Sequence, residues 1–140
     1  MLAGRREFIA EAWQWKQRLG GAMRQAGIIA AGGVFALRHH IERLPEDHAN
    51  ARVLAEGLAQ LRGLAVRPQE VETNIVIVDV SRTGLSAQQF SDRLLSKGLR
   101  MSLVGPYRLR AVTHLDVSRK DVEQALAIIK DVLKPLNLPE

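Results

Sequence analysis

The first 44 residues of the chain place their apolar positions at helical spacing. In residues 5–19 these positions recur at three- and four-residue steps, which predicts an amphipathic helix ending at a Gly-Gly pair. A second helix is predicted over residues 23–44, and its centre, residues 28–37, is apolar nearly all round. A helix of this kind must be buried against several partners. Because this helical arm has no strand to cover it, we expect it to dock on a part of the protein that this chain lacks.

After the arm, β-type segments appear between the helices. Proline fits the first turn of a helix, so a third helix is predicted from Pro45 to about Arg62, with Gly63 as its terminator. β-branched residues then cluster in residues 73–80, as in a buried strand, and residues 64–66 form a shorter strand candidate.

The last third of the chain continues the alternation of helix and strand. Ser86 is a predicted N-cap for a helix that ends at Gly98. Strands at 100–104 and 107–113 are predicted to form a hairpin around a Gly-Pro turn. Ser118 is predicted to cap a final amphipathic helix.

These elements predict an α/β fold. Long connecting helices are followed by a small α/β sandwich, in which helices cover one face of a mostly antiparallel sheet. We divide the chain into a helical arm, residues 1–44, and a small C-terminal α/β domain, residues 45–140.

Composition narrows the possible chemistry. The chain of 140 residues has no cysteine, which excludes thiolate nucleophiles and cysteine-based metal sites. Its 20 basic residues are mixed with 15 acidic ones and aromatic residues are only 4%, a pattern that argues against a nucleic-acid-binding surface. The longest nearly apolar run, residues 26–37, is shorter than the ~20 residues that span a membrane. Without a recognisable signal segment, we expect a cytoplasmic protein that binds no membrane.

Arg110 is the leading candidate for chemistry. In a strand over 107–113, Leu109 and Ala111 point to one face of the sheet and Arg110 to the other. If the first two pack under the helices, the guanidinium projects from the open face. A planar guanidinium there can hold a carboxylate through two hydrogen bonds; the alternative is an ordinary surface arginine.

Four motifs carry a resemblance to a known family: LGGAMRQAG at 19–27, RLPEDHANA at 43–51, TN at 73–74 and RAVTHLDVS at 110–118. In this order they resemble the carboxy-terminal half of low-specificity L-threonine aldolases, lyases that depend on pyridoxal 5'-phosphate. The resemblance covers essentially the whole chain. It implies the small domain of a fold-type-I enzyme and a homo-oligomeric protein, dimer or tetramer, well over twice this length. The amino-terminal portion would then hold the cofactor and the Schiff-base lysine.

The resemblance implies retro-aldol cleavage of L-threonine, L-allo-threonine or another β-hydroxy amino acid to glycine and an aldehyde. Arg110 matches the family arginine that binds the substrate carboxylate, and no residue of this chain is assigned a catalytic or metal-binding role. Arg24 matches a residue that could help to hold the cofactor phosphate beside a helix N-terminus; the alternative is a structural arginine. Many family members have a lysine where this chain has Gln17, so a cationic role at that position is in doubt.

Several other residues are weaker candidates. Lys97, within an SKG sequence, is interpreted as a helix-terminal cation rather than a Schiff-base lysine. The pair His39-His40 is expected to face solvent rather than a metal. His48 and His114 are expected to be capping or turn-fixing groups. Asp116 is expected to brace the turn before the last helix. Trp13 and Trp15 are expected to be buried against a missing domain or a second subunit.

Two other classes of function stay open. If Met1 is a genuine start, the chain is a stand-alone, non-catalytic interaction module or the partner of a separate cofactor-binding chain. The apolar arm argues against a free-standing module, because a monomer should not leave such a surface uncovered. A nucleic-acid-binding role is a more distant alternative.

Overall fold

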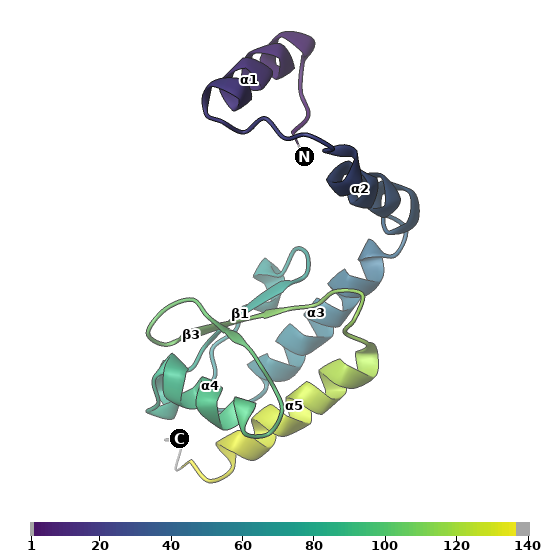
Figure 1. Cartoon of the computed structure of the whole chain (residues 1–140). Helices are drawn as coiled ribbons and strands as arrows, with labels where there is room; N and C mark the ends of the chain where they lie inside the picture. Colours follow the sequence, from purple (N-terminus) through teal and green to yellow (C-terminus); the bar gives the residue numbers. More distant parts are fainter. Residues whose placement is uncertain (1, 137–140) are drawn as a thin grey trace. The chain divides into compact units, whose positions relative to one another are not determined.

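The computed structural model describes residues 2–136 and divides the chain into two compact units, Met1–Glu42 and Arg43–Glu140. Helices α1 and α2 belong to the first unit, and the sheet with its covering helices belongs to the second (Figure 1).

The first unit contains two helices and no buried side chain among its described residues. Helix α1 spans Arg6–Arg18 and helix α2 spans Gly27–His39. The predicted helix over 23–44 is therefore too long at both ends. At its start, Gln25 has φ 52°, a left-handed conformation that no helix interior tolerates. At its end, α2 stops at His39, and residues 40–43 form a turn before α3 begins at Leu44 with Pro45 in its first turn.

The apolar positions of both helices are exposed. Trp13 and Trp15 of α1 are 58% and 50% exposed, and Ile28 and Phe35 of α2 are 79% and 56% exposed. The expectation that α2 is buried against several partners is thus not met within residues 2–136, and its docking on a missing part of the protein stays a prediction.

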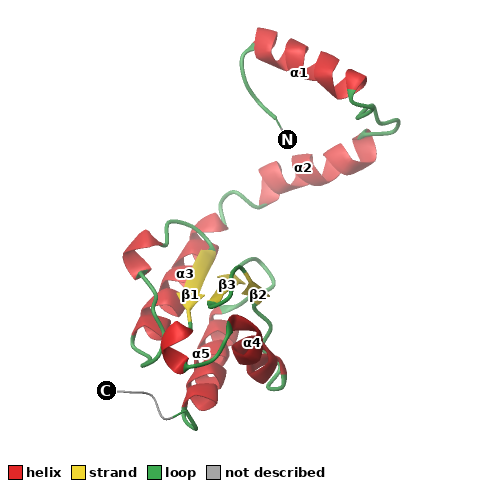
Figure 2. Cartoon of the chain, turned by 90° about the vertical axis from the view of Figure 1, so that its left-hand side faces the viewer, coloured by secondary structure: helices red, strands yellow, loops and turns green. Residues whose placement is uncertain are grey.

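The second unit is an antiparallel sheet covered on one face by helices (Figure 2). Its strands have the order β1-β3-β2. The elements, in chain order, are α3 (Leu44–Ala59), the 3-10 turn η1 (Pro68–Glu70), β1 (Ile75–Asp79), the 3-10 turn η2 (Ser81–Thr83), α4 (Ala87–Leu95), β2 (Ser102–Leu103), β3 (Arg108–Val112) and α5 (Arg119–Leu133). This arrangement confirms the predicted small α/β sandwich.

The alternation of side chains along the strands separates a core face from an open face. Val76 and Val78 of β1 and Leu109 of β3 are at most 1% exposed and pack against the helices. Ile75 and Ile77, one residue out of phase, are exposed on the opposite face. Burial on one face alone sets the register of the sheet, because a slip by one residue would exchange the two sets.

The structure confirms the helix caps and the hairpin, which are decided by residues close together in the sequence. Ser86 and Ser118 each form a capping box, with Gln89 and Asp121 as the reciprocal partners. Gly98 adopts φ 83° after α4, and β2 and β3 form the predicted hairpin, although β2 has only two residues. The strand expected at 64–66 is reduced to one bridge, between Ala65 and Asp79.

Helices α3 and α5 approach closely at Gly57. A Cβ atom on this residue would lie 2.6 Å from one methyl carbon of Leu126 and 2.7 Å from the other. A Cβ at position 57 would therefore require the Leu126 side chain to shift.

We predict that Gly57→Ala destabilises the chain despite the higher helix propensity of alanine. Overpacking against Leu126 should cost about 1–3 kcal/mol, more than the ~1 kcal/mol gained by removing a mid-helix glycine. Urea unfolding of the 140-residue chain measures the difference. In a Leu126→Ala background the same substitution should become stabilising; a gain in the unmodified background would refute the packing argument.

Candidate functional site

Arg110 lies at the centre of the open face of the sheet. Its neighbours across the ladder are Ile77 on β1 and Ser102 on β2, and both are exposed. Leu109 is fully buried and Ala111 half-buried on the helix face, so the alternation predicted for this strand is confirmed. Within residues 2–136 the Arg110 guanidinium has no hydrogen-bond or ion-pair partner. It is a free cation whose partner position on β1 is occupied by isoleucine.

Arg108 lies on the same face and differs from Arg110 in having a partner. Its Nε atom is 3.6 Å from Oδ2 of Asp79, the residue opposite it in the β1–β3 register. Asp79 also accepts a hydrogen bond of 2.9 Å from the backbone N–H of Ser81. Hydrogen bonds from the Ser81 side chain and backbone lower the pKa of the Asp79 carboxyl, and the charge of Arg108 lowers that pKa further.

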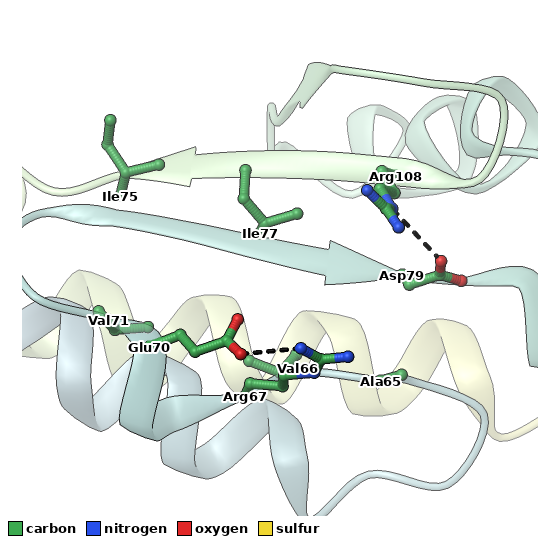
Figure 3. A pocket seen from close by; sticks show the side chains of 9 residues that line it. All are labelled: Ala65, Val66, Arg67, Glu70, Val71, Ile75, Ile77, Asp79 and Arg108. Carbon is green, nitrogen blue, oxygen red and sulfur yellow. Dashed lines mark hydrogen bonds and ion pairs between the residues drawn. The ribbon is translucent and has the colours of Figure 1, made fainter.

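A groove of about 460 Å³ borders β1 on this side of the unit (Figure 3). Its apolar lining includes Ile75 and Ile77, and its charged lining consists of two ion pairs, Arg67–Glu70 at 2.8 Å and Arg108–Asp79. Since these charges already compensate each other, the groove offers no unpaired cation to a carboxylate. The unpaired cation of this face is Arg110, which is not among the residues lining the groove.

Buried polar groups hold the strand segment that follows Arg110. The hydroxyl of Thr113, a residue only 2% exposed, donates to the carbonyl of Asp47 at 2.7 Å. Asn74 Nδ2 donates to the carbonyl of Thr113 at 2.8 Å, and Asn50 Nδ2 donates to that of Val117 at 3.3 Å. Sequence reasoning identified these motifs but missed the network, because its partners are separated by 39 to 67 positions.

Arg24, the second predicted site residue, belongs to the first unit, so the structure gives no common site for it and Arg110. It is exposed and has no partner within the described residues. Two residues later, Ala26 precedes α2 without a side-chain cap; the Ile28 N–H donates to the Gln25 carbonyl at 3.2 Å, and the other N–H groups of the first turn have no side-chain acceptor. A guanidinium beside an uncapped helix N-terminus is a donor set suited to a phosphate, so the residues present fit the predicted cofactor group.

Among the weaker candidates, two side chains are exposed and one is half-buried. Lys97 is exposed in the turn after α4, and His39 is exposed on α2. His40 was expected to face solvent, and this prediction is wrong because the side chain is half-buried. Its ring centroid lies 5.4 Å from that of Phe35. Its buried Nδ1 atom has no hydrogen-bond partner among the described residues.

The turn before α5 is fixed by His114, as predicted, whereas Asp116 contributes only its backbone N–H and its side chain is 78% exposed. His114 Nδ1 accepts a hydrogen bond of 3.2 Å from the Asp116 backbone N–H, and lies 3.6 Å from the Asp116 carboxylate. His48 is half-buried beside Arg52 and Arg119 in a separate surface pocket of about 420 Å³.

Over residues 2–136, no group of three or more histidine, aspartate or glutamate residues is arranged to hold a metal ion. In the same part of the chain, none of the helices has the length and apolar character needed to cross a membrane.

Comparison with known proteins defines the family of this chain. The family model for beta-eliminating lyases matches residues 1–81, and the chain belongs to this family. It is 35% identical over 133 residues to the probable low-specificity L-threonine aldolase 2 of Arabidopsis thaliana, covering 94% of this chain and 38% of that protein. It is 36% identical over 127 residues to the low specificity L-threonine aldolase of Escherichia coli K12, covering 91% of this chain and 36% of that protein. The chain thus spans little more than a third of these relatives.

Solved structures show the same fold at low sequence identity. The glutamate decarboxylase of Lactobacillus brevis matches with a TM-score of 0.56 and 19% identity, covering 69% of this chain and 24% of that one. MppP, soaked with 2-ketoarginine, matches with a TM-score of 0.55 and 16% identity, covering 66% of this chain and 28% of that one. The predicted fold class is confirmed.

We predict that Asp79 contributes to a loss of stability in acid. Because its pKa is lowered in the folded chain from an ordinary value of 3.8, its contribution is present above about pH 4 and is lost as the pH falls through the folded value. Asp79→Asn should therefore reduce the drop in urea midpoint between about pH 6 and pH 3.

The matched control is Glu123→Gln, which removes an exposed carboxylate without a hydrogen bond or ion pair within residues 2–136. It should leave the pH dependence nearly unchanged. Equal behaviour of the two variants would show that the Ser81 and Arg108 contacts of Asp79 do not matter in solution.

Proposed function

We propose that the chain is the carboxylate-recognising part of a pyridoxal-phosphate-dependent lyase that cleaves L-threonine, or a related β-hydroxy amino acid, to glycine and an aldehyde. Membership of the beta-eliminating lyase family and the similarity to threonine aldolases support the reaction class. The observation that carries the proposal is the unpaired guanidinium of Arg110 on the open face of the sheet.

Arg110 is the cation of this face best suited to bind an incoming carboxylate. The Arg108 guanidinium already faces Asp79, so a second carboxylate would have to compete with an existing one. Arg110 presents its planar fork without such competition, and two parallel N–H···O bonds would fix both the position and the rotation of the substrate carboxylate. Holding the carboxylate in one orientation selects which bond to the α-carbon is placed for cleavage.

The residues of this chain contribute binding rather than covalent chemistry in this proposal. Pyridoxal phosphate, when bound, supplies the electron sink for the carbanion that forms at the α-carbon. Arg24 and the free N–H groups at the start of α2 would hold its phosphate. The lysine that attaches the cofactor would belong to the part of the relatives that this chain does not span, and the complete enzyme would be a homo-oligomer.

In this proposal, residues outside this chain determine which aldehyde is released. A carboxylate-binding arginine reads a group that all α-amino acids share, so Arg110 does not distinguish L-threonine from L-allo-threonine or phenylserine. The side chain of the substrate would be recognised by residues outside this chain.

The alternative of a free-standing module is disfavoured by the first unit. Helices α1 and α2 expose both tryptophans together with isoleucine and phenylalanine side chains and bury none of them. An apolar surface of this kind is characteristic of a contact with another part of a protein. We therefore propose that this unit packs on the remainder of the enzyme or on a second subunit.

The proposal predicts that the chain is inactive alone and active with its complement. The purified chain should show no cofactor absorbance and no formation of glycine from threonine, whereas both should appear after mixing with a separately expressed amino-terminal half of a threonine aldolase. In that mixture Arg110→Ala should raise KM for threonine about 10- to 100-fold, the range expected for lost charge-assisted hydrogen bonds. Arg110→Lys should recover only part of the loss, because an ammonium cannot reproduce the bidentate fork.

Arg108→Ala is the matched control, since it removes the same charge from the same face of the same strand. Its KM should stay within about threefold of the unmodified mixture, because a half-exposed ion pair contributes little. Equal effects of the two alanine substitutions would show that the face acts only through its net charge. Activity of the chain alone would overturn the proposal and make Lys97 the first residue to replace.

The same mixture should bury the two tryptophans. With 5-fluorotryptophan incorporated only into this chain, the two fluorine resonances from positions 13 and 15 should be sensitive to exchange of H2O for D2O in the isolated chain. This sensitivity should fall when the amino-terminal half is added, because apolar contact excludes water from the ring. Trp13→Phe and Trp15→Phe assign the two signals. Unchanged sensitivity at both positions in an active mixture would refute the docking of α1.

A further inference from the structure

We propose that Thr113 and Asn74 are positioning residues for Arg110. They join the end of the β1–β3 ladder to the first turns of α3 and thereby fix the place of the guanidinium on the open face. This inference rests on the proposed function of Arg110 as the ligand of a substrate carboxylate.

The two residues bond to each other through both backbone and side chain. The Thr113 N–H donates to the Asn74 carbonyl at 2.9 Å, and Asn74 Nδ2 returns a hydrogen bond of 2.8 Å to the Thr113 carbonyl. The pair continues the β1–β3 register by one position beyond Ile75 and Val112. An asparagine side chain thus takes the place of a further ladder bond at the point where the strands end.

The hydroxyl of Thr113 connects this pair to α3. It donates to the Asp47 carbonyl at 2.7 Å, in a site where the threonine is 2% exposed. The Asp47 side chain is held in turn by two hydrogen bonds from Arg43, of 2.9 and 3.0 Å. The carbonyl that receives the Thr113 hydroxyl therefore belongs to a fixed residue, and Arg43, Asp47, Thr113 and Asn74 form one continuous connection.

The need for such a connection follows from the short length of β2. Strand β2 pairs with β3 only through Ser102 and Leu103, opposite Arg110 and Leu109. Past Arg110, β3 has β1 on one side and, on the other, a cavity of about 340 Å³ whose lining includes Arg100, Val112 and Thr113. With one neighbouring strand missing, this end of β3 is held by its pairing with β1 and by the hydrogen bonds of Thr113 and Asn74.

Small movements of this strand end affect substrate binding, because the two hydrogen bonds to the carboxylate depend on the position of the guanidinium. A displacement of about 1 Å in a positioning group can cost ~100-fold in rate. Arg110 is three residues from Thr113 on the same strand, so a strand that frays at Thr113 would let the guanidinium move relative to its ligand. The guanidinium would keep its charge but would no longer be held in one position.

The test uses the reconstituted mixture of this chain with an amino-terminal half of a threonine aldolase. Thr113→Val keeps the shape of the side chain and removes the hydroxyl, and should raise KM for threonine about tenfold, a fraction of the ~100-fold cost of a full displacement. The value of kcat should fall as well, because a displaced carboxylate no longer places the bond at the α-carbon for cleavage. Thr113→Ser restores the hydroxyl and should return KM to within about threefold.

Thr83→Val is the matched control for a purely structural effect. The Thr83 hydroxyl is also buried and donates to a backbone carbonyl, that of Val80 at 2.6 Å, but its bonds remain within the turn formed by residues 80–85. Its loss should lower the melting temperature without raising KM. If Thr113→Val prevents assembly, Asn74→Ala, which removes a half-buried side chain, provides the same comparison.

A second readout needs neither cofactor nor activity. In the 140-residue chain alone, amide hydrogen exchange at Ala111 and Val76 should accelerate in Thr113→Val and stay unchanged in Thr83→Val. Equal KM values for the two valine variants, with Arg110→Ala still raising KM, would overturn this inference and leave the proposed function intact. An unchanged KM in Arg110→Ala would instead overturn the proposed function.

Discussion

The structure of the second unit depends on strand β3 being buried on one face and open on the other. Leu109 is fully buried between sheet and helices, while Arg108 and Arg110 lie on the exposed face. Because neighbouring side chains of a strand point in opposite directions, apolar burial of one residue forces its neighbours outward. The hydrophobic core therefore determines that both arginines are solvent-accessible. The proposed substrate-binding cation is therefore placed by the packing of residues on the other face of the sheet.

The surroundings of the two arginines then separate their roles. Both extend from the same strand and the same face, and the ladder gives each a different neighbour on β1: Asp79 opposite Arg108 and Ile77 opposite Arg110. A carboxylate opposite one arginine neutralises it locally, and an isoleucine opposite the other leaves its charge uncompensated. In the proposed function, the residue on β1 thus contributes to recognition together with the arginine on β3.

The parts of the fold that the sequence predicted correctly are those decided by near neighbours. The capping boxes at Ser86 and Ser118 involve residues three positions apart, and the alternation around Arg110 follows from strand geometry alone. The errors have other causes. Gln25 delays the start of the predicted helix through its backbone conformation, which a glutamine in the sequence does not signal. The Thr113–Asp47 bond joins residues 66 positions apart, a separation at which a single sequence provides no pairing information.

The contrast between the two units supports the proposal from a direction independent of Arg110. In the second unit, apolar residues of helices and strands share one core, whereas helices α1 and α2 bury no side chain at all. Helix α2 has no polar face to present to water, since its centre is apolar nearly all round, and exposure of such a helix is unfavourable at ~25 cal/mol per Å² of apolar surface. The sequence of α2 is consequently suited to a buried environment that residues 2–136 do not supply. An enzyme whose carboxylate-binding domain is tied to its cofactor-binding domain through buried helices would supply that environment, and this explains why the same chain combines a self-sufficient core with helices that have none.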